Sequence, residues 1–171
     1  MHRFEIGPKS RTGHVDIDGQ LRTLFDLANE VLFGPLQEQN PPEFRHSVTF
    51  LFSYLEYHLA SEELAMLEHG YPSRRFHAAF HDHIRREARG ISVSLARKFS
   101  LEEARSAIFF LLEDWAVYHV DQADRQLADY LQEQAPAGVA PQLPGIHPLN
   151  SSGTVTDEPG KRALAGAPNR H

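Results

Sequence analysis

Two histidines four residues apart, His77 and His81 in the stretch HAAFH, have the types and spacing to do chemistry together. Residues i and i+4 lie one above the other on one face of a helix, so a helix here directs both imidazoles to one point. Only Ala, Ala and Phe separate them, which indicates a largely apolar face. The pair predicts a metal site, although a single such pair also occurs in helices that bind no metal.

Comparable pairs of donors occur before and after this stretch. His58 and Glu62 are four residues apart, and His119 and Asp124 are five apart in WAVYHVDQAD. Burying ionisable groups without partners costs several kcal/mol, roughly the desolvation penalty, and a metal cation removes that cost. The chain contains no Cys, so any metal must use imidazoles and carboxylates, which suit iron, zinc or manganese.

Each pair also has an ordinary explanation, either an exposed helix pair or a satisfied hydrogen bond. Their joint occurrence on three consecutive predicted helices favours the metal site. We expect eight further ionisable residues to have no ligand role. Those assigned to surface or loop are His46, His69, His83 and His147; those expected to be solvated are Glu63 and Asp82; those at the chain ends are His2 and His171.

The apolar periodicity predicts four helices that would position these donors. The first, GQLRTLFDLANEVLF, would be capped by Asp18 and closed by Gly34 and Pro35. The second would run from Pro41 and Pro42 to Gly70, and the third from a Ser73 cap to about Lys98, with Gly90 as a weak interior position. The fourth would open on a capping box at Ser100 and Glu103 and end before Pro136.

Four amphipathic helices with short loops predict an all-α fold, an antiparallel up-down four-helix bundle with an N-terminal arm. We place the bundle at residues 1–135. Residues 136–171 hold six of the 11 prolines and five of the 11 glycines, and form a predicted tail or linker, either disordered or packed on the bundle.

Composition narrows the functional classes. The formal net charge of -6 does not suggest a nucleic-acid-binding protein, and no run approaches the ~18 apolar residues of a membrane span. No N-terminal apolar signal segment is present, so we expect a cytoplasmic protein without nucleic-acid or membrane partners.

The order of these motifs resembles the bacterial hemerythrins over about residues 4–134. HLASEE is similar to the family's HFxxEE, and the GYP, HAAFH and WAVYHVDQAD stretches match in order and spacing. TGHVDIDGQLRTLF resembles the segment that contains the family's IDxQHxxLF. The family holds a non-heme di-iron centre with five histidines and two bridging carboxylates.

The resemblance implies that one iron is bound by His77, His81 and His119. A second iron would be bound by His58, and the bridging carboxylates would be Glu62 and Asp124. The fifth family histidine is replaced here by Leu21. The expected cofactor is therefore two iron ions, or a single iron if the second site is lost.

Several groups could replace the missing ligand. His14 would need the N-terminal arm to fold back, Tyr54 could approach from the second helix, and Gln20 and Arg22 should point elsewhere on the first helix. Water or an open position on the second iron is the favoured alternative. The candidate ligand pocket comprises Leu21, Phe25, Tyr54, Trp115, Ala116 and Val120. Ala116 and Val120 are smaller than the family's Leu and Ile, which would widen this pocket unless packing elsewhere compensates.

The resemblance implies binding of dioxygen or of a related ligand such as peroxide or nitric oxide, for oxygen binding or sensing. An additional exchangeable position on one iron would favour faster autoxidation than in a carrier with all seven ligands. The alternatives are a di-iron enzyme of peroxidase or oxidase type, a sensor or interaction module that docks a protein partner through 136–171, and a bundle that binds no metal.

Overall fold

The computed structural model describes residues 1–8, 10–34, 41–97, 100–136 and 139–144. Within these ranges every regular element is helical, which confirms the predicted all-helical class. Among the described residues, no helix combines the length and the apolar composition needed to cross a membrane.

Helix α1 spans Val15–Phe33, four residues more at its start than the sequence predicted. The predicted cap, Asp18, lies inside the first turn, and its carboxylate accepts bonds from the backbone N–H groups of Thr12 and Gly13. Gly13 has a φ of 89°, a backbone conformation that glycine adopts without strain. Asp18 therefore fixes the turn that leads into α1, and His14 occupies the position before the helix.

Helix α2 spans Pro41–Glu68 and helix α3 spans Arg74–Ala96. Gly70 has a φ of 65° and ends α2 where the sequence predicted, because a glycine in this conformation stops a helix without a Cβ clash. Ser73 precedes α3 as expected, but its side chain makes no capping bond. The predicted end of the third helix near Lys98 lies outside the described residues, and α3 itself ends two residues earlier.

The last helical stretch consists of three segments rather than the single helix predicted. Helix α4 spans Leu101–Asp114, a π-helix η2 spans Trp115–Asp124, and helix α5 spans Arg125–Gln134. The predicted capping box is present, since the Ser100 side chain accepts from the Glu103 N–H while the Glu103 carboxylate accepts from the Ser100 N–H. The last helix ends before Pro136, as predicted.

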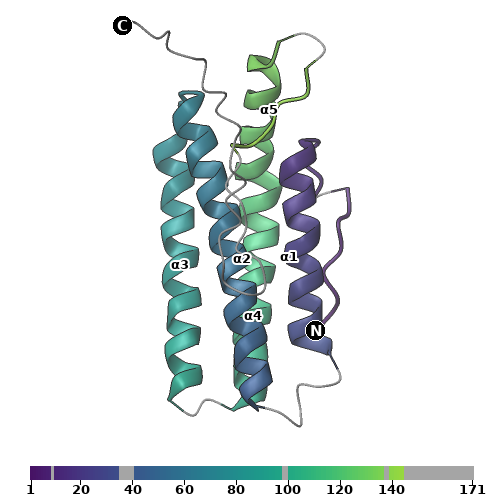
Figure 1. Ribbon diagram of the computed structural model, residues 1–171, viewed down its shortest axis with the longest axis vertical. Helices are drawn as coiled ribbons and strands as arrows, with labels where there is room; N and C mark the ends of the chain where they lie inside the picture. The colour runs from purple at the N-terminus through teal and green to yellow at the C-terminus, as the bar shows by residue number, and fades with distance from the viewer. Residues whose placement is uncertain (9, 35–40, 98–99, 137–138, 145–171) are drawn as a thin grey trace, which may run out of the picture.

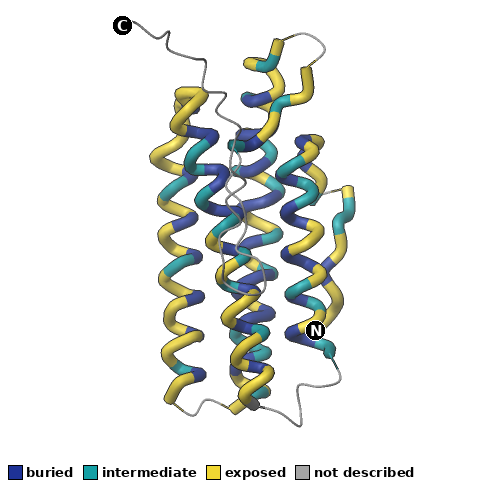
Figure 2. Tube along the Cα trace, viewed as in Figure 1, coloured by how far each residue is buried: buried dark blue, intermediate teal, exposed yellow. Residues whose placement is uncertain are grey.

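Four long helices pack against one another, counting the α4–η2–α5 stretch as one (Figure 1). Helix α1 contacts α2 and α4, α2 contacts α3, and α3 contacts both α4 and η2. Buried residues recur at intervals along each of the four helices (Figure 2). This closed ring places residues of α2, α3 and η2 opposite one another in the interior, where the predicted donors lie.

Two segments outside the helices pack onto the bundle. The N-terminal arm, residues 1–8 and 10–14, is held where the Phe4 N–H and C=O both bond to the Asn29 amide, at 2.9 and 2.8 Å. Within the predicted tail, Leu143 is buried and its N–H donates to Asp16 at 2.7 Å. Residues 145–171, including His147 and His171, lie outside the described residues.

Candidate metal centre

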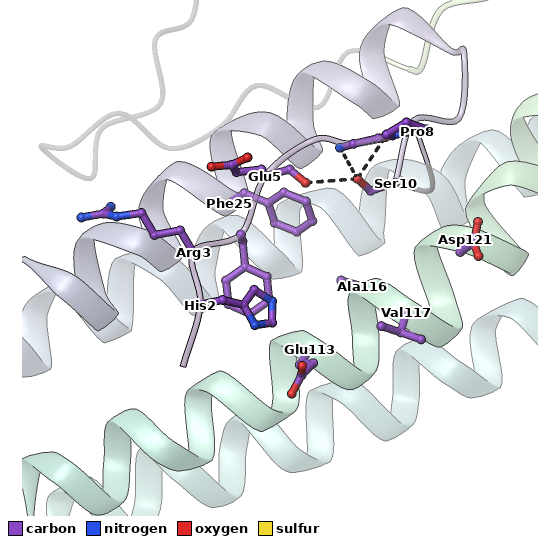
Figure 3. A pocket seen from close by; sticks show the side chains of 12 residues that line it. His2, Arg3, Glu5, Pro8, Ser10, Phe25, Glu113, Ala116, Val117 and Asp121 are labelled. Carbon is purple, nitrogen blue, oxygen red and sulfur yellow. Dashed lines mark hydrogen bonds between the residues drawn. The ribbon is translucent and has the colours of Figure 1, made fainter.

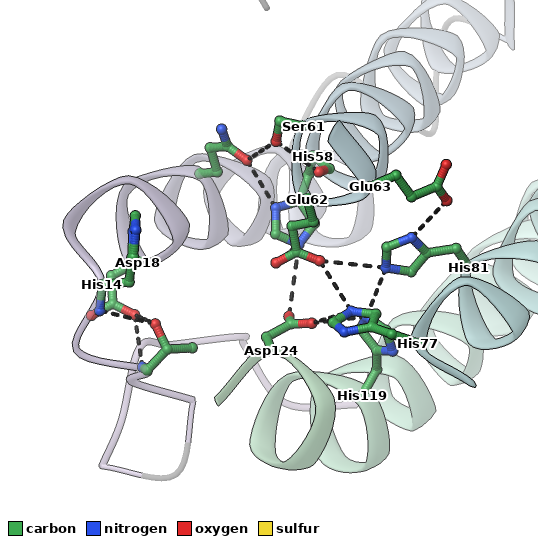
Figure 4. Close-up of polar contacts among 12 residues, drawn as sticks. His14, Asp18, His58, Ser61, Glu62, Glu63, His77, His81, His119 and Asp124 are labelled. Atoms are coloured by element: carbon green, nitrogen blue, oxygen red, sulfur yellow. Dashed lines mark hydrogen bonds and ion pairs between the residues drawn. The ribbon is translucent and has the colours of Figure 1, made fainter. Parts of the chain in front are cut away.

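Three imidazoles from two helices meet inside the bundle. The Nε2 atom of His119 lies 3.1 Å from Nε2 of His77 and 3.1 Å from Nε2 of His81 (Figure 4). All three side chains are at most 3% exposed. The HAAFH spacing on α3 therefore aims both of its imidazoles at one point, and η2 supplies the third.

The carboxylates of Glu62 and Asp124 lie between this group and His58. One oxygen of Glu62 is 3.3 and 3.4 Å from Nε2 of His77 and His81, and its other oxygen is 3.7 Å from Nε2 of His58. One oxygen of Asp124 is 2.8 Å from Nε2 of His119, and its other oxygen is 3.8 Å from His58. Each carboxylate thus presents one oxygen to the three histidines and one to His58.

The π-helix explains how His119 and Asp124 act together although they are five residues apart. In an α-helix, five residues correspond to about 500° of rotation, which leaves the two side chains about 140° apart. The wider i→i+5 turn of a π-helix brings such residues closer to one face, and π segments often occur at functional sites. Both residues belong to η2, which spans Trp115–Asp124.

The cluster is buried and its polar atoms lack ordinary partners. His58, Glu62, His81 and Asp124 are 0% exposed. Among the described residues, Nε2 of His58 and all four oxygens of the two carboxylates have no partner in hydrogen-bond geometry. Buried polar groups in native proteins are almost always satisfied, so orphaned atoms grouped in this way need a shared partner.

Proton affinities within the cluster show what this partner must supply. Burial lowers the pKa of His77, but the nearby carboxylates of Asp124 and Glu62 outweigh it and raise that pKa to about 9. Burial raises the pKa of Glu62 and so does Asp124, but His58, His77 and His81 lower it to about 2. The same balance raises the pKa of His58 and lowers that of Asp124. The two carboxylates therefore retain their charge and require positive charge beside them.

A metal ion fits these residues better than protons do. Glu62, His77, His81, His119 and Asp124 each offer a donor atom, and these atoms lie within 4.8 Å of one another. Ligand nitrogens about 2.1 Å from a metal and at right angles are about 3.0 Å apart, against about 3.4 Å for tetrahedral ligands. The two separations of 3.1 Å, from His119 to His77 and to His81, are closer to the right-angled value than to the tetrahedral one. The cluster could therefore hold a metal cation.

His58 is oriented by Gln20, which contradicts the prediction that Gln20 points elsewhere. Gln20 is 9% exposed, and its Oε1 accepts a bond from Nδ1 of His58 at 3.0 Å and from the Ser61 hydroxyl at 3.0 Å. The buried arc of α1 is wide enough to include residue 20 as well as Leu21, which is 0% exposed. Helix α1 thus supplies a hydrogen-bond acceptor for His58, while the Leu21 side chain offers no donor atom.

Glu63 was predicted to be solvated, and this is wrong. Its Oε1 accepts a bond from Nδ1 of His81 at 2.8 Å and another from Arg85 at 2.6 Å. Arg85 also pairs with Glu56. A carboxylate on the remote nitrogen of a ligating histidine fixes its tautomer and raises its basicity. The two consecutive acids in ASEEL were the sequence signal for this role, because Glu62 can face the donor cluster while Glu63 bonds to a histidine of that cluster.

The remaining predicted residues are divided between the core and the surface. His46, His69, His83 and Asp82 are exposed, as predicted. The Tyr54 ring packs on Tyr57, with centroids 5.5 Å apart, and no described contact joins it to the cluster. His14 is buried with neither ring nitrogen partnered, and it has no described hydrogen bond or ring contact with the donors, although the charge of Glu62 raises its pKa.

Within the candidate pocket, Trp115 is 1% exposed and its ring stacks on His119. The Phe25 ring is edge-on to Trp115, with the two ring centroids 6.2 Å apart. Val120 is fully buried. Phe25 and Ala116 line a cavity of 640 Å³ whose lining includes none of the donors.

Comparisons with protein-family models, with curated proteins and with solved structures found no match to this chain.

Proposed function

We propose that the chain is a non-heme di-iron protein that binds dioxygen or a related small ligand such as peroxide or nitric oxide. The observation that carries the proposal is the position of Glu62 and Asp124, each with one oxygen toward the three histidines and one toward His58. Carboxylates in this position suit a bridge between two metal ions. His77, His81 and His119 would hold one iron, and His58 would hold the other.

The donor set suits iron, zinc or manganese, and the hemerythrin-like order of the motifs favours iron among them. Imidazole and carboxylate donors without thiolate suit iron, and near-octahedral spacing is less suited to structural zinc, which is almost always tetrahedral. Iron bound here would supply a redox metal with a position for a small ligand. Because Leu21 offers no donor, the His58 side retains an additional exchangeable position in this proposal. Trp115 would exclude bulk water from one side of the cluster, since it is buried and its ring packs beside His58 and His119.

The helix arrangement agrees with this proposal. The connections 69–73 and 97–100 are short, and short connections join antiparallel neighbours. Together with the chain order in Figure 1, they support an antiparallel up-down bundle, in which facing helices bring metal ligands together in the core.

Iron per chain in protein from iron-supplemented cells, followed by the spectrum of the ferrous protein on exposure to oxygen, tests the proposal. We expect about two irons per chain and a reversible spectral change on exposure to oxygen. Close to one iron would mean that the His58 site is lost, and reversible binding by a pair of irons would then be excluded. If the chain instead oxidises a dye in the presence of peroxide, and His119→Ala does not, the protein is an enzyme.

A further inference from the structure

A cavity of 640 Å³ lies between the N-terminal arm and the helical stretch α4–η2. Figure 3 shows the arm crossing above Glu113, Ala116 and Val117, with Phe25 behind it. The volume is within the roughly 300–1,000 Å³ of small-molecule sites. The cavity is partly open to solvent, so a small molecule could enter it without the bundle unfolding.

The arm is fixed on both sides of the cavity. On one side, Phe4 is held by the two bonds to Asn29, and on the other, Arg125 donates to the Pro8 carbonyl while it pairs with Asp121. Ser10 donates to the Glu5 carbonyl and accepts from the Gly7 N–H, which shapes the intervening turn (Figure 3). These bonds hold the arm above the cavity instead of letting it collapse onto α4 and η2.

The lining determines the class of molecule that fits. Phe4, Phe25, Ala116 and Val117 provide apolar and aromatic walls. The acidic side chains Glu5, Glu113 and Asp121 are also at the cavity. Asp121 is paired with Arg125, and the Arg3 guanidinium lies over the Phe33 ring at 5.1 Å. Glu113 is half-buried and has no hydrogen bond or ion pair among the described residues. A cationic group on the ligand would therefore pair with its carboxylate.

We infer that this cavity, here called the arm cavity and lined by residues 2–5, 7, 8 and 10 with Phe25, Glu113, Ala116, Val117 and Asp121, binds a small aromatic amine. The aromatic ring packs between Phe25 and Ala116, and the ammonium group pairs with Glu113. This site is distinct from the metal centre, and the inference does not rest on the proposed function. The bound amine would lie near the candidate metal centre, because the Phe25 ring packs edge-on against Trp115. The Trp115 and His58 ring centroids are in turn 5.6 Å apart.

Trp115 is the chain's single tryptophan, which makes its fluorescence a reporter for the neighbouring arm cavity. The experiment is a titration of the full chain with 2-phenylethylamine, followed by Trp115 emission and by calorimetry. The same titrations with 2-phenylethanol and 3-phenylpropionate compare a neutral and an anionic ligand of similar size. We expect the amine to bind best and the anion worst. Equal binding of amine and anion, or no binding of the amine, would overturn the inference.

Two variants locate the site. Glu113→Gln keeps the shape and removes the charge, so amine affinity should fall about fivefold while binding of the alcohol is unchanged. Ala116→Phe fills the cavity, so binding of both ligands should fall about tenfold or more, through lost apolar contact area. Glu87→Gln and Ala79→Phe, at exposed positions on α3, are the matched controls and should bind as the unmodified chain does. Unchanged amine affinity in both cavity variants would show that the amine binds elsewhere.

Discussion

The Nδ1 atom of His58 lies 3.0 Å from Oε1 of Gln20, the residue directly before Leu21. The carbonyl oxygen of the Gln20 amide can only accept a bond, so Nδ1 carries the proton and Nε2 faces the two carboxylates. Helix α1 thus contributes to the candidate site by orienting the His58 imidazole. This contact gives the His58 side of the cluster a neutral partner, whereas His81 on the other side has the carboxylate of Glu63.

We expect Gln20→Leu to weaken metal binding at His58 by about 10- to 100-fold, the usual cost of losing a hydrogen-bond partner of a ligating histidine. Binding by the three-histidine group should change less, because Gln20 contacts none of its members among the described residues. Titration with ferrous iron under anaerobic conditions separates the two steps. Gln20→Glu should retain the second metal, because its carboxylate accepts the same bond. Equal second-site affinity in Gln20→Leu and in an exposed-site control, Gln126→Leu, would contradict this role.

Leu21→His places an imidazole at the position that corresponds to the fifth histidine of the hemerythrin motif IDxQHxxLF. In the metal-free protein, we expect unfolding free energy to fall by about 2–5 kcal/mol, because a fully buried Leu side chain is lost and a polar group replaces it. In the iron-loaded protein, the added ligand should slow autoxidation of the oxygen-bound form.

The matched control for this change is Leu24→His, since Leu24 is also 0% exposed on α1 and lies one turn further along the helix. It should show the same loss of stability in the metal-free protein without slower autoxidation. An unchanged autoxidation rate in Leu21→His would mean that the open position on the His58 side does not limit the lifetime of the bound oxygen.

Spacing along the sequence was enough to find the donors, because residues four apart on a helix share a face whatever the helix packs against. His58 lies beside Glu62, and His77 beside His81, as this spacing predicts. The five-residue separation of His119 and Asp124 was the one available signal for the π-helix, since an α-helix would point them apart.

The partners of these donors could not be predicted in the same way. Gln20 and Glu63 bond to histidines on other helices, 38 and 18 residues away in the chain. Their roles depend on the rotation of each helix about its axis, which is determined by packing of the whole bundle and not by local periodicity. The start of α1 was missed for a related reason, since Asp18 serves the preceding turn instead of the helix that contains it.

Glu63→Gln tests whether the charge on the partner of His81 tunes the metal. The amide still accepts a bond from Nδ1 of His81, but the negative charge near the histidine is removed. The histidine then donates less electron density, so we expect the ferric state to be destabilised and the reduction potential to rise. A spectroelectrochemical titration of the iron-loaded protein measures this change.

Glu56→Gln is the control for Glu63→Gln, because Glu56 also pairs with Arg85 but has no described contact with His81. Loss of an ion pair with Arg85 is common to both variants. A rise in potential that is the same in both would therefore be due to Arg85, and the charge beside His81 would have no specific effect.

His14 makes folding sensitive to mild acid. Burial lowers its pKa, and the nearby acids Asp16, Asp18 and Glu62 only partly oppose this. When the pKa of a base is lower in the folded state, the base contributes its full stabilisation at pH values above its unfolded-state pKa, which is near 6.5 for histidine. This stabilisation is lost as the pH falls through the folded-state pKa. Each unit of lowering corresponds to about 1.4 kcal/mol.

We therefore expect the free energy of unfolding of the chelator-treated protein to fall from about pH 7.5 to about pH 5, and His14→Leu to remove part of that slope. Urea unfolding at a series of pH values measures the difference between the two proteins, so that titration of the cluster itself, common to both, cancels. His83→Leu at an exposed position should leave the slope unchanged. If His14→Leu and His83→Leu have the same slope, the pKa of His14 does not differ between the folded and unfolded states, and burial of His14 does not make folding sensitive to acid.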